Sequence, residues 1–237
     1  MRFDVITLFP EVIESYCAAS IVGRAQRDRI IAVKTHNVRA YGEGRHRQVD
    51  DKPYGGGPGM VFKAGPLIKT VSAVLKLAPR KKTKIILFSA KGRLFTQRMA
   101  VRLARSYERI VMICGRYEGI DERVKSIVKA EEISIGPYVL TDGDIPALAV
   151  ISSVMRLLPG AITFESLEEE SFYRRLVRGP EQEETLEYPH YTRPEVVVYK
   201  GKKYRVPKAL LSGNHAAISK WREKHMRNVK IKSQKSR

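Results

Sequence analysis

The fold is decided by one stretch, Arg-Ile-Val-Met-Ile-Cys-Gly-Arg-Tyr-Glu-Gly at residues 109–119. Its first half is apolar over a length that is typical of a strand buried on both faces of a sheet. Gly115 follows this strand directly, and a short helix is predicted beyond it, over residues 121–128. A buried strand that turns through glycine into a helix is the repeating unit of an α/β protein.

Outward from this stretch, strands and helices alternate along residues 1–160. Strand-forming runs are predicted at residues 3–9, 30–33, 84–89, 109–114 and 132–135. Helical patterns are predicted at residues 10–18, 65–77, 96–107, 121–128 and 145–158. This order predicts an α/β fold whose mostly parallel sheet is covered by helices on both faces.

Three of the predicted strands end in polar sequences that contain glycine. They are Ser89-Ala90-Lys91-Gly92, Gly115-Arg116-Tyr117-Glu118-Gly119 and Ile135-Gly136-Pro137-Tyr138. In parallel sheets, ligands bind at the carboxyl ends of the strands. The three sequences therefore predict one pocket for a nucleotide-like ligand.

The chain is strongly basic. It holds 44 Lys and Arg against 25 Asp and Glu, which gives a net charge of +19. Such an excess indicates an anionic partner, which could be nucleic acid, an acidic membrane surface or an acidic protein. No apolar run approaches the roughly 18 residues that a membrane-spanning helix needs, so no membrane partner is expected.

Composition also divides the chain. Residues 165–187 hold eight Glu and three Arg, whereas residues 200–237 hold thirteen Lys or Arg and one Glu. We therefore expect a core domain at 1–160, an acidic linker at 161–188 and a small, mainly helical basic domain at 189–237.

Two cysteines, Cys17 and Cys114, are too few for a disulfide framework and fit a cytoplasmic protein. Cys114 is interpreted as a small buried residue, because nothing near it in the sequence would lower its pKa. The five histidines match no zinc spacing. A Ser–His–Asp hydrolase is excluded, because the chain has no Gly-x-Ser-x-Gly nucleophile elbow.

A long loop is predicted over Arg-His-Arg-Gln-Val-Asp-Asp-Lys-Pro-Tyr-Gly-Gly-Gly-Pro-Gly-Met at residues 45–60. Its glycines permit positive φ or a close approach of the backbone to a ligand. The loop is neither a P-loop nor a dinucleotide-binding fingerprint, because its glycine spacing matches neither. A mobile surface loop stays open as an alternative, but the charges around Tyr54 favour RNA contact. The residues expected to contact RNA are Arg45, His46, Asp50, Tyr54, Gly57 and Gly59.

Four motifs occur in order along the chain and carry a resemblance. They are Gly-Gly-Gly-Pro-Gly-Met within residues 50–60, Gly-Arg-Tyr-Glu-Gly-Ile-Asp-Glu-Arg-Val at 115–124, Pro-His-Tyr-Thr-Arg-Pro-Glu-Val at 189–196 and Leu-Leu-Ser-Gly-Asn-His at 210–215. Together they resemble the bacterial tRNA (guanine-N1)-methyltransferase family, which belongs to the SPOUT class. The resemblance runs from Met1 to about Lys224.

The resemblance implies a SPOUT-type parallel sheet with a deep trefoil knot, and a homodimer with each active site at the interface. A knot would not be expected from the residues alone, because knots are rare. The implied methyl donor is S-adenosylmethionine, and magnesium is associated with the activity. The implied substrate is the guanosine immediately 3′ of the tRNA anticodon, methylated on ring nitrogen 1.

The resemblance also implies roles for individual residues. The methyl donor would be bound by Leu87, Phe88, Ser89, Gly115, Tyr117, Glu118, Gly119, Ser134, Ile135, Gly136, Tyr138, Leu140, Gly143 and Pro146. Arg156 would stabilise the guanine oxygen, and Glu170 would be the base. The anticodon arm would be held by His190, Tyr191, Arg193, Asn214, His215, Trp221 and Arg222.

The chain departs from the family pattern at the base. The family has an aspartate there, and Glu170 is one methylene longer, which could move the carboxylate by about 1 Å. Glu168 and Glu169 are alternative bases.

Other departures fall on the loops and the linker. Asp142 stands where a glycine is usual, Pro137 where an aspartate is usual and Ala90 where a proline is usual. The linker at 173–187 is longer than expected, and the C-terminal domain is short. Two other functions stay open: a SPOUT methyltransferase acting on a different RNA, and an RNA-binding factor whose catalytic residues have decayed.

Overall fold

The computed structural model describes residues 1–77, 82–162, 184–186, 188–225 and 227–229 of the chain. The chain forms two compact units, Met1–Ile162 and Thr163–Arg237. The predicted division into core, linker and basic domain stays a prediction, because most of the predicted linker lies outside the described residues. No helix in the described ranges is long and apolar enough to span a membrane.

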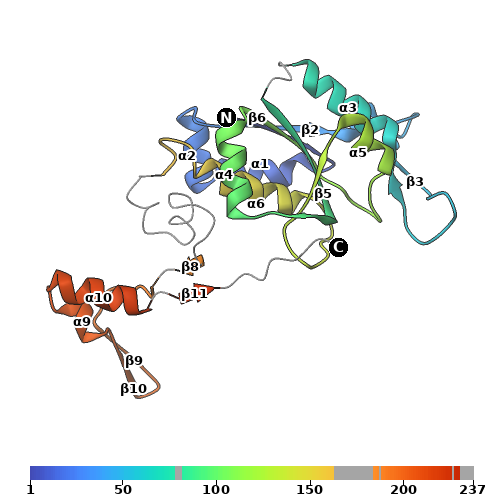
Figure 1. Ribbon diagram of the computed structural model, residues 1–237. Helices are drawn as coiled ribbons and strands as arrows, with labels where there is room; N and C mark the ends of the chain where they lie inside the picture. Colours follow the sequence, from blue (N-terminus) through green and yellow to red (C-terminus); the bar gives the residue numbers. More distant parts are fainter. Residues whose placement is uncertain (78–81, 163–183, 187, 226, 230–237) are drawn as a thin grey trace. The chain divides into compact units, whose positions relative to one another are not determined.

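The first unit is built on a five-stranded sheet whose strands are all parallel (Figure 1). In spatial order the strands are β2 (Ala32–Asn37), β1 (Arg2–Thr7), β6 (Arg109–Ile113), β5 (Thr83–Leu94) and β7 (Glu131–Ser134). The predicted α/β fold with a parallel sheet is thereby confirmed.

The strand predicted at residues 30–33 begins later than expected, at Ala32. The backbone N–H groups of Ile30 and Ile31 both donate to the carbonyl of Ala25 and close the end of the preceding helix. The backbone N–H groups of these two residues therefore hydrogen-bond to a carbonyl at the end of the helix and do not pair with β1.

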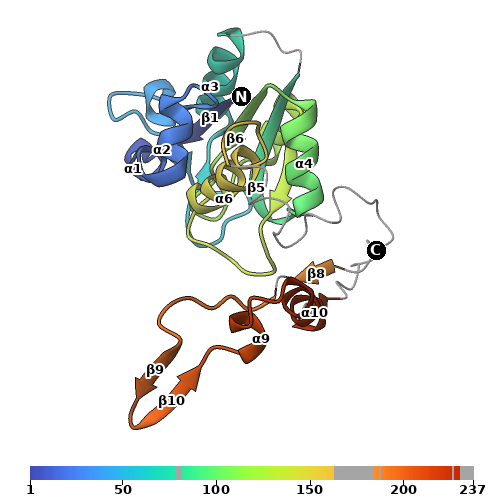
Figure 2. The same ribbon diagram turned by 90° about the vertical axis from the view of Figure 1, so that its left-hand side faces the viewer.

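Helices cover both faces of the sheet (Figure 2). One face is covered by α1 (Pro10–Ala18), α2 (Ser20–Arg27), α4 (Gln97–Ser106) and α6 (Asp144–Met155). The other face is covered by the 3-10 helix η1 (Val38–Tyr41), α3 (Ala64–Lys76) and α5 (Glu122–Val128).

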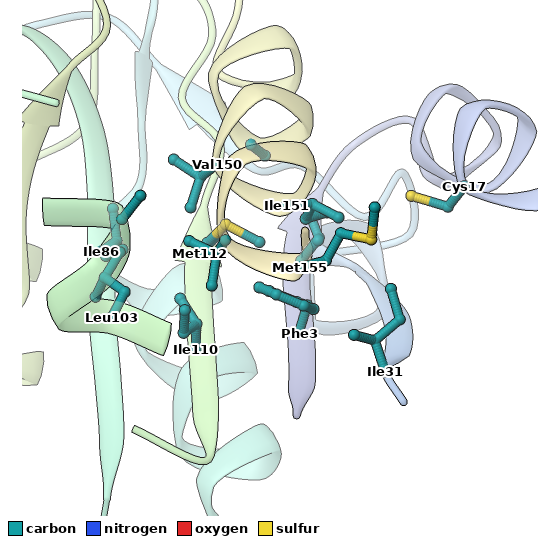
Figure 3. Close-up of a cluster of buried hydrophobic side chains, with 14 of the residues drawn as sticks. Phe3, Cys17, Ile31, Ile86, Leu103, Ile110, Met112, Val150, Ile151 and Met155 are labelled. Carbon is teal, nitrogen blue, oxygen red and sulfur yellow. The ribbon is translucent and has the colours of Figure 1, made fainter. Parts of the chain in front are cut away.

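The core follows from the period-two alternation of the strands. Ile110 and Met112 of β6 face the α6 side, whereas Val111 and Ile113 face the α3 side. Figure 3 shows Val150, Ile151 and Met155 of α6 beside side chains of the sheet. Burying each of these side chains contributes about 1.5–3 kcal/mol to stability.

Helix α2 was not predicted, because its sequence Ser-Ile-Val-Gly-Arg-Ala-Gln-Arg is short and polar and contains a glycine. Gly23 is required there, since a Cβ at this position would lie 2.2 Å from the carbonyl oxygen of Ala18. The close approach lets Val22 and Ala25 reach the core.

The second unit contains β9 (Val196–Tyr199) paired antiparallel with β10 (Lys202–Arg205), followed by α9 (Lys208–Leu211) and α10 (His215–His225). A further short pair joins β8 (Glu184–Leu186) to β11 (Arg227–Val229). A helix was predicted in this unit, but neither strand pair was. The helical part is interrupted at Gly213, whose φ is +67°, and Asn214 then caps α10 by accepting from the N–H of Ala217 at 3.1 Å.

Candidate active site

A cavity of about 450 Å³ lies at the carboxyl ends of β6 and β7 and beside residues 87–91 of β5. This volume falls within the roughly 300–1,000 Å³ that is typical of small-molecule sites. The prediction that a strand ends before Ser89-Ala90-Lys91-Gly92 is wrong, because β5 continues through these residues to Leu94 and pairs with β7 again after a register shift. The structure brings together every residue that the sequence analysis assigned to the methyl donor: Leu87, Phe88, Ser89, Gly115, Tyr117, Glu118, Gly119, Ser134, Ile135, Gly136, Tyr138, Leu140, Gly143 and Pro146 all line it.

The loop after β6 has an unusual backbone. Tyr117 is in the left-handed region at φ +61°, and Gly119 follows at φ +139°. A non-glycine residue in this region costs about 1–2 kcal/mol, so the surrounding structure must hold it. Burial and the neighbouring Asp50 carboxylate raise the pKa of Tyr117, whose ring also contacts Phe62 at 5.4 Å between centroids.

The loop after β7 is fastened to the loop after β6. The N–H of Gly143 donates to the carbonyl of Gly115 at 2.8 Å. A Cβ at position 143 would lie 2.7 Å from the Cα of Cys114, so only glycine permits this approach. The two loops therefore form one continuous wall of the cavity.

The glycine-rich loop reaches the same cavity rim. The carbonyl of Met60 accepts from the N–H of Glu118 at 3.0 Å, and the N–H of Phe62 donates to the carbonyl of Gly119 at 3.0 Å. Gly55, Gly56, Gly57 and Gly59 all have positive φ, which confirms the backbone role predicted for them. Tyr54 is fully exposed, and Arg45 and His46 are also exposed.

Arg116 is a site residue that the sequence analysis did not assign. Its guanidinium lies 4.3 Å from the centre of the Phe9 ring and pairs with Asp142 at 3.2 Å and Asp144 at 3.9 Å. Asp142 was noted only as a departure from the family pattern, and a single sequence gave no signal that the two residues meet.

Asp144 lies at the first turn of α6 and is 1% exposed. Burial raises the pKa of its carboxyl, against the hydrogen bond that Thr7 Oγ1 donates to it at 2.6 Å. The carboxylate therefore joins the end of β1 to the start of α6 beneath the cavity.

Four charged side chains on the cavity lining were also missed. Lys91 pairs with Glu122 at 2.9 Å, and Lys125 pairs with Glu132 at 2.5 Å. Cross-contacts join Lys91 to Glu132 at 4.0 Å and Lys125 to Glu122 at 3.6 Å. Lys91 lies in β5, whereas its two partners, Glu122 and Glu132, come from α5 and β7, so proximity in the fold was needed to find them.

Cys114 is 2% exposed, and burial raises the pKa of its thiol well above the usual range. Cys17 is buried as well, and both thiols are free. The interpretation of Cys114 as a small buried residue is confirmed.

Arg156 does not line this cavity. It is the C-terminal cap of α6 and lines a second cavity of about 380 Å³ beside Tyr16, Ile21 and Met155. Pro146, which lines the first cavity, precedes Arg156 by ten residues on the same helix, or about 15 Å at 1.5 Å per residue. Within one chain, Arg156 is therefore far from the predicted donor site.

The predicted base Glu170 and its alternatives Glu168 and Glu169 lie outside the described residues. No group of three or more His, Cys, Asp and Glu side chains placed to hold a metal ion occurs in the described part of the chain. No magnesium site can therefore be assigned there.

In the second unit, two of the residues predicted to contact tRNA lie beside Tyr188, and two more contact each other. The ring of His190 is 4.7 Å from that of Tyr188, and the guanidinium of Arg222 is 4.8 Å from it. The rings of Tyr191 and Trp221 are 6.1 Å apart. Arg193 and His215 are exposed, whereas Asn214 caps α10.

The comparisons with known proteins agree with this geometry. Residues 1–236 match the family described as tRNA (Guanine-1)-methyltransferase TrmD. A tRNA (guanine-N(1)-)-methyltransferase of Thermomicrobium roseum is 49% identical over 222 residues, which covers 94% of this chain and 77% of the relative. The protein of the same name from Ruminiclostridium cellulolyticum is 45% identical over 223 residues, covering 94% and 89%. The one from Clostridioides difficile is 44% identical over 223 residues, covering 94% and 90%.

These matches extend over nearly the whole chain and include the cavity and the glycine-rich loop. They confirm the resemblance that the four motifs predicted. The chain belongs to the tRNA (guanine-1)-methyltransferase TrmD family.

Proposed function

We propose that this chain transfers the methyl group of S-adenosylmethionine to ring nitrogen 1 of the guanosine immediately 3′ of the anticodon in tRNA. The observation that carries the proposal is the cavity between β5 and the ends of β6 and β7 in a chain of this family. The relatives' names support a guanine of tRNA as the acceptor.

The cavity fits the proposed donor. Gly115, Gly119 and Gly143 present backbone edges without side chains, which suits a flat nucleoside portion. Apolar Leu87 and Leu140 contribute side chains that can pack on a ring system. When bound, S-adenosylmethionine supplies an electrophilic methyl group on a sulfonium.

The chain's own residues would align the acceptor and move one proton. Ring nitrogen 1 of guanine carries a proton near neutrality, and the Glu170 carboxylate would remove it. The Arg156 guanidinium would stabilise the negative charge that develops on the guanine oxygen. Nitrogen 1 then forms its bond to the methyl carbon as the carbon–sulfur bond breaks, which leaves a neutral thioether. Positioning of the two reactants supplies much of the acceleration.

The active site would be shared between two copies of the chain. The separation of Arg156 from the first cavity along α6 supports this, because among the described residues neither cavity is lined by both Arg156 and the proposed donor-binding residues. Tyr16 and Ile21, beside the second cavity, are 45% and 41% exposed. We propose that the second copy of the homodimer covers this apolar surface.

The finer features of the fold and location belong to the same proposal. The close passage of the 136–143 loop against Cys114 and Gly115 supports the trefoil knot of the SPOUT class. The acidic segment at 161–188 would be the linker, and residues 189–237 would form a basic, tRNA-binding C-terminal domain. The two free cysteines fit a cytoplasmic enzyme.

The experiment that tests this function combines donor binding with turnover. Calorimetry should detect S-adenosylmethionine binding to the wild type, to Arg156→Ala and to Glu170→Ala with similar affinity. Both variants should lose about a hundredfold or more in methyl transfer to tRNA.

The variants Glu168→Gln and Glu169→Gln are the matched controls and should turn over as the wild type does. If Glu170→Ala kept full activity and either control lost activity, the base would be Glu168 or Glu169 and not Glu170. Wild-type protein that binds tRNA but no donor would favour the decayed RNA-binding factor.

A further inference from the structure

The hairpin β9–β10 exposes both of its faces to solvent. Val197, Val198, Tyr199 and Tyr204 are each at least 50% exposed, and the intervening lysines are exposed as well. In both ribbon views the hairpin extends away from α9 and α10 (Figures 1 and 2). An isolated two-stranded hairpin is only marginally stable in water, so a surface of this kind is explained by a partner.

The register of the hairpin sorts its side chains onto two faces. Tyr199 lies opposite Lys202, and Tyr204 lies opposite Val197, so both tyrosines share one face. Lys203 and Arg205 belong to the opposite face. The amine of Lys200 is 5.5 Å from the ring centre of Tyr199, and that of Lys202 is 5.4 Å from the ring centre of Tyr204.

The charge of the hairpin identifies the chemistry of the partner. Residues 196–205 hold three Lys and one Arg and no acidic residue. The tip is Lys200-Gly201, so charge lies where a membrane-inserting hairpin would need apolar side chains. Aromatic rings with a cation beside each one are the combination that binds nucleic acid, through base stacking and phosphate contact.

We propose that the hairpin β9–β10 is an RNA-binding surface on which Tyr199 and Tyr204 stack against unpaired bases while Lys202 and Lys203 contact the phosphate backbone. The proposal rests on the proposed function only for the identity of the RNA, which is tRNA. The hairpin lies within residues 189–237, which the proposed function assigns to tRNA binding as a whole, but none of these four residues was individually expected to contact tRNA.

The test measures tRNA affinity of the full-length protein at several salt concentrations. The double variant Tyr199→Ala/Tyr204→Ala should bind tRNA about tenfold more weakly or worse, with an unchanged salt dependence, because stacking involves no counterion release. The double variant Lys202→Ala/Lys203→Ala should weaken binding and lower the slope of log affinity against log salt by about one to two.

The matched control is Lys69→Ala/Lys76→Ala, which removes the same charge from the exposed side of α3 and should bind tRNA as the wild type does. Trp221 is the chain's one tryptophan and stacks on His225 at 4.0 Å. Its fluorescence therefore reports whether the second unit of each variant is folded.

Wild-type tRNA affinity in both folded hairpin variants would overturn the proposal. If the hairpin variants lost binding to anionic phosphatidylserine vesicles but kept wild-type tRNA affinity, the hairpin would be a membrane-binding surface and the proposal would be overturned. The proposed function has its own test and is wrong if the wild type transfers no methyl group to tRNA. In that case the tRNA-binding measurement still decides whether the hairpin binds RNA.

Discussion

At the scale of single residues, the pair Arg116–Asp142 joins two loops of the cavity wall. Asp142 accepts from Arg116 at 3.2 Å and from Thr141 Oγ1 at 3.1 Å, and its other oxygen accepts from the N–H of Asp144 at 3.0 Å. A hydrogen bond to a charged group contributes about 1.5–3 kcal/mol. The contacts indicate that Asp142 positions the loop after β7 before the donor binds.

We therefore predict that Asp142→Asn, which keeps the shape and removes the charge, raises the dissociation constant of S-adenosylmethionine about tenfold. Calorimetry measures this directly. The loss of donor affinity in the double variant Arg116→Gln/Asp142→Asn should be smaller than the sum of the losses in the two single variants, because both changes break the same pair.

Asp121→Asn is the matched control, since Asp121 also lines the cavity but pairs with Arg123 within its own helix start. Its donor affinity should match the wild type. Additive losses in the double variant would refute the positioning role of the pair.

Asp4, in the middle of β1, is the centre of a buried charge network. Its side chain is fully buried and is bound by Arg109 at 2.6 Å, Arg2 at 2.8 Å and His36 at 2.7 Å. Burial alone would raise the pKa of Asp4, but the hydrogen bonds from His36, Arg2 and Arg109 lower it well below its usual range.

Because the folded-state pKa is depressed, the stabilisation by Asp4 is present above about pH 4 and is lost as the pH falls below it. Asp4→Asn should reduce the free energy of unfolding by about 3–5 kcal/mol near neutral pH, since it leaves Arg109 buried without its charge partner. Urea unfolding near neutrality and near pH 3 measures the change. An equal loss at both pH values would contradict the assignment.

At the scale of elements, the contact between the loops after β6 and β7 depends on one glycine. Gly143→Ala would force the two loops apart, since the new Cβ meets backbone atoms of Cys114 and Gly115 within 2.8 Å. We expect a loss of stability of about 1–3 kcal/mol and a loss of donor affinity. Thermal unfolding and calorimetry measure the two effects.

The control for this prediction is Gly65→Ala in α3, where the new Cβ meets only the end of the flexible Glu43 side chain at 3.1 Å. That variant should bind donor normally. Donor affinity in Gly143→Ala equal to the wild type would show that the loop contact does not shape the cavity.

Most elements of the first unit could be predicted because their patterns are local. The apolar run at 109–114 and the amphipathic pattern at 96–107 match β6 and α4 within one residue at each end. The misses have physical reasons. Helix α2 is short and polar, and its Gly23 serves the tight turn from α1 by passing close to the Ala18 carbonyl. The β9–β10 hairpin lacks the alternation of a half-buried strand, because both its faces are exposed.

At the scale of the whole molecule, the strand-end glycines predicted the position of the cavity, because parallel strands end at the same edge of a sheet. The sequence could not reveal which charged residues meet there. The pairs Lys91–Glu122 and Arg116–Asp142 join residues 31 and 26 positions apart. The distance of Arg156 from the cavity, by contrast, follows already from the helix predicted at 145–158, because Pro146 and Arg156 are ten residues apart along it.

The distance of Arg156 from the cavity yields a prediction for the proposed homodimer. Leu140 lines the cavity and is 39% exposed, so Leu140→Trp should fill the cavity without disrupting the core. A protein chain with this substitution should bind no donor. Mixed dimers of Leu140→Trp with Arg156→Ala chains should recover about half of wild-type methyl transfer, because one of two shared sites combines an intact cavity with an intact Arg156.

Homodimers of either variant are the controls and should be inactive. Verified mixed dimers that stay inactive would show that Arg156 acts on the cavity of its own chain.

The measurement that tests the central claim most directly maps the product. The purified enzyme is incubated with methyl-labelled S-adenosylmethionine and with unfractionated tRNA and ribosomal RNA, and the labelled nucleoside is identified and located. The account predicts that the label is found in 1-methylguanosine immediately 3′ of the anticodon in tRNA. Label on ribosomal RNA alone, or on another position of tRNA, would contradict it.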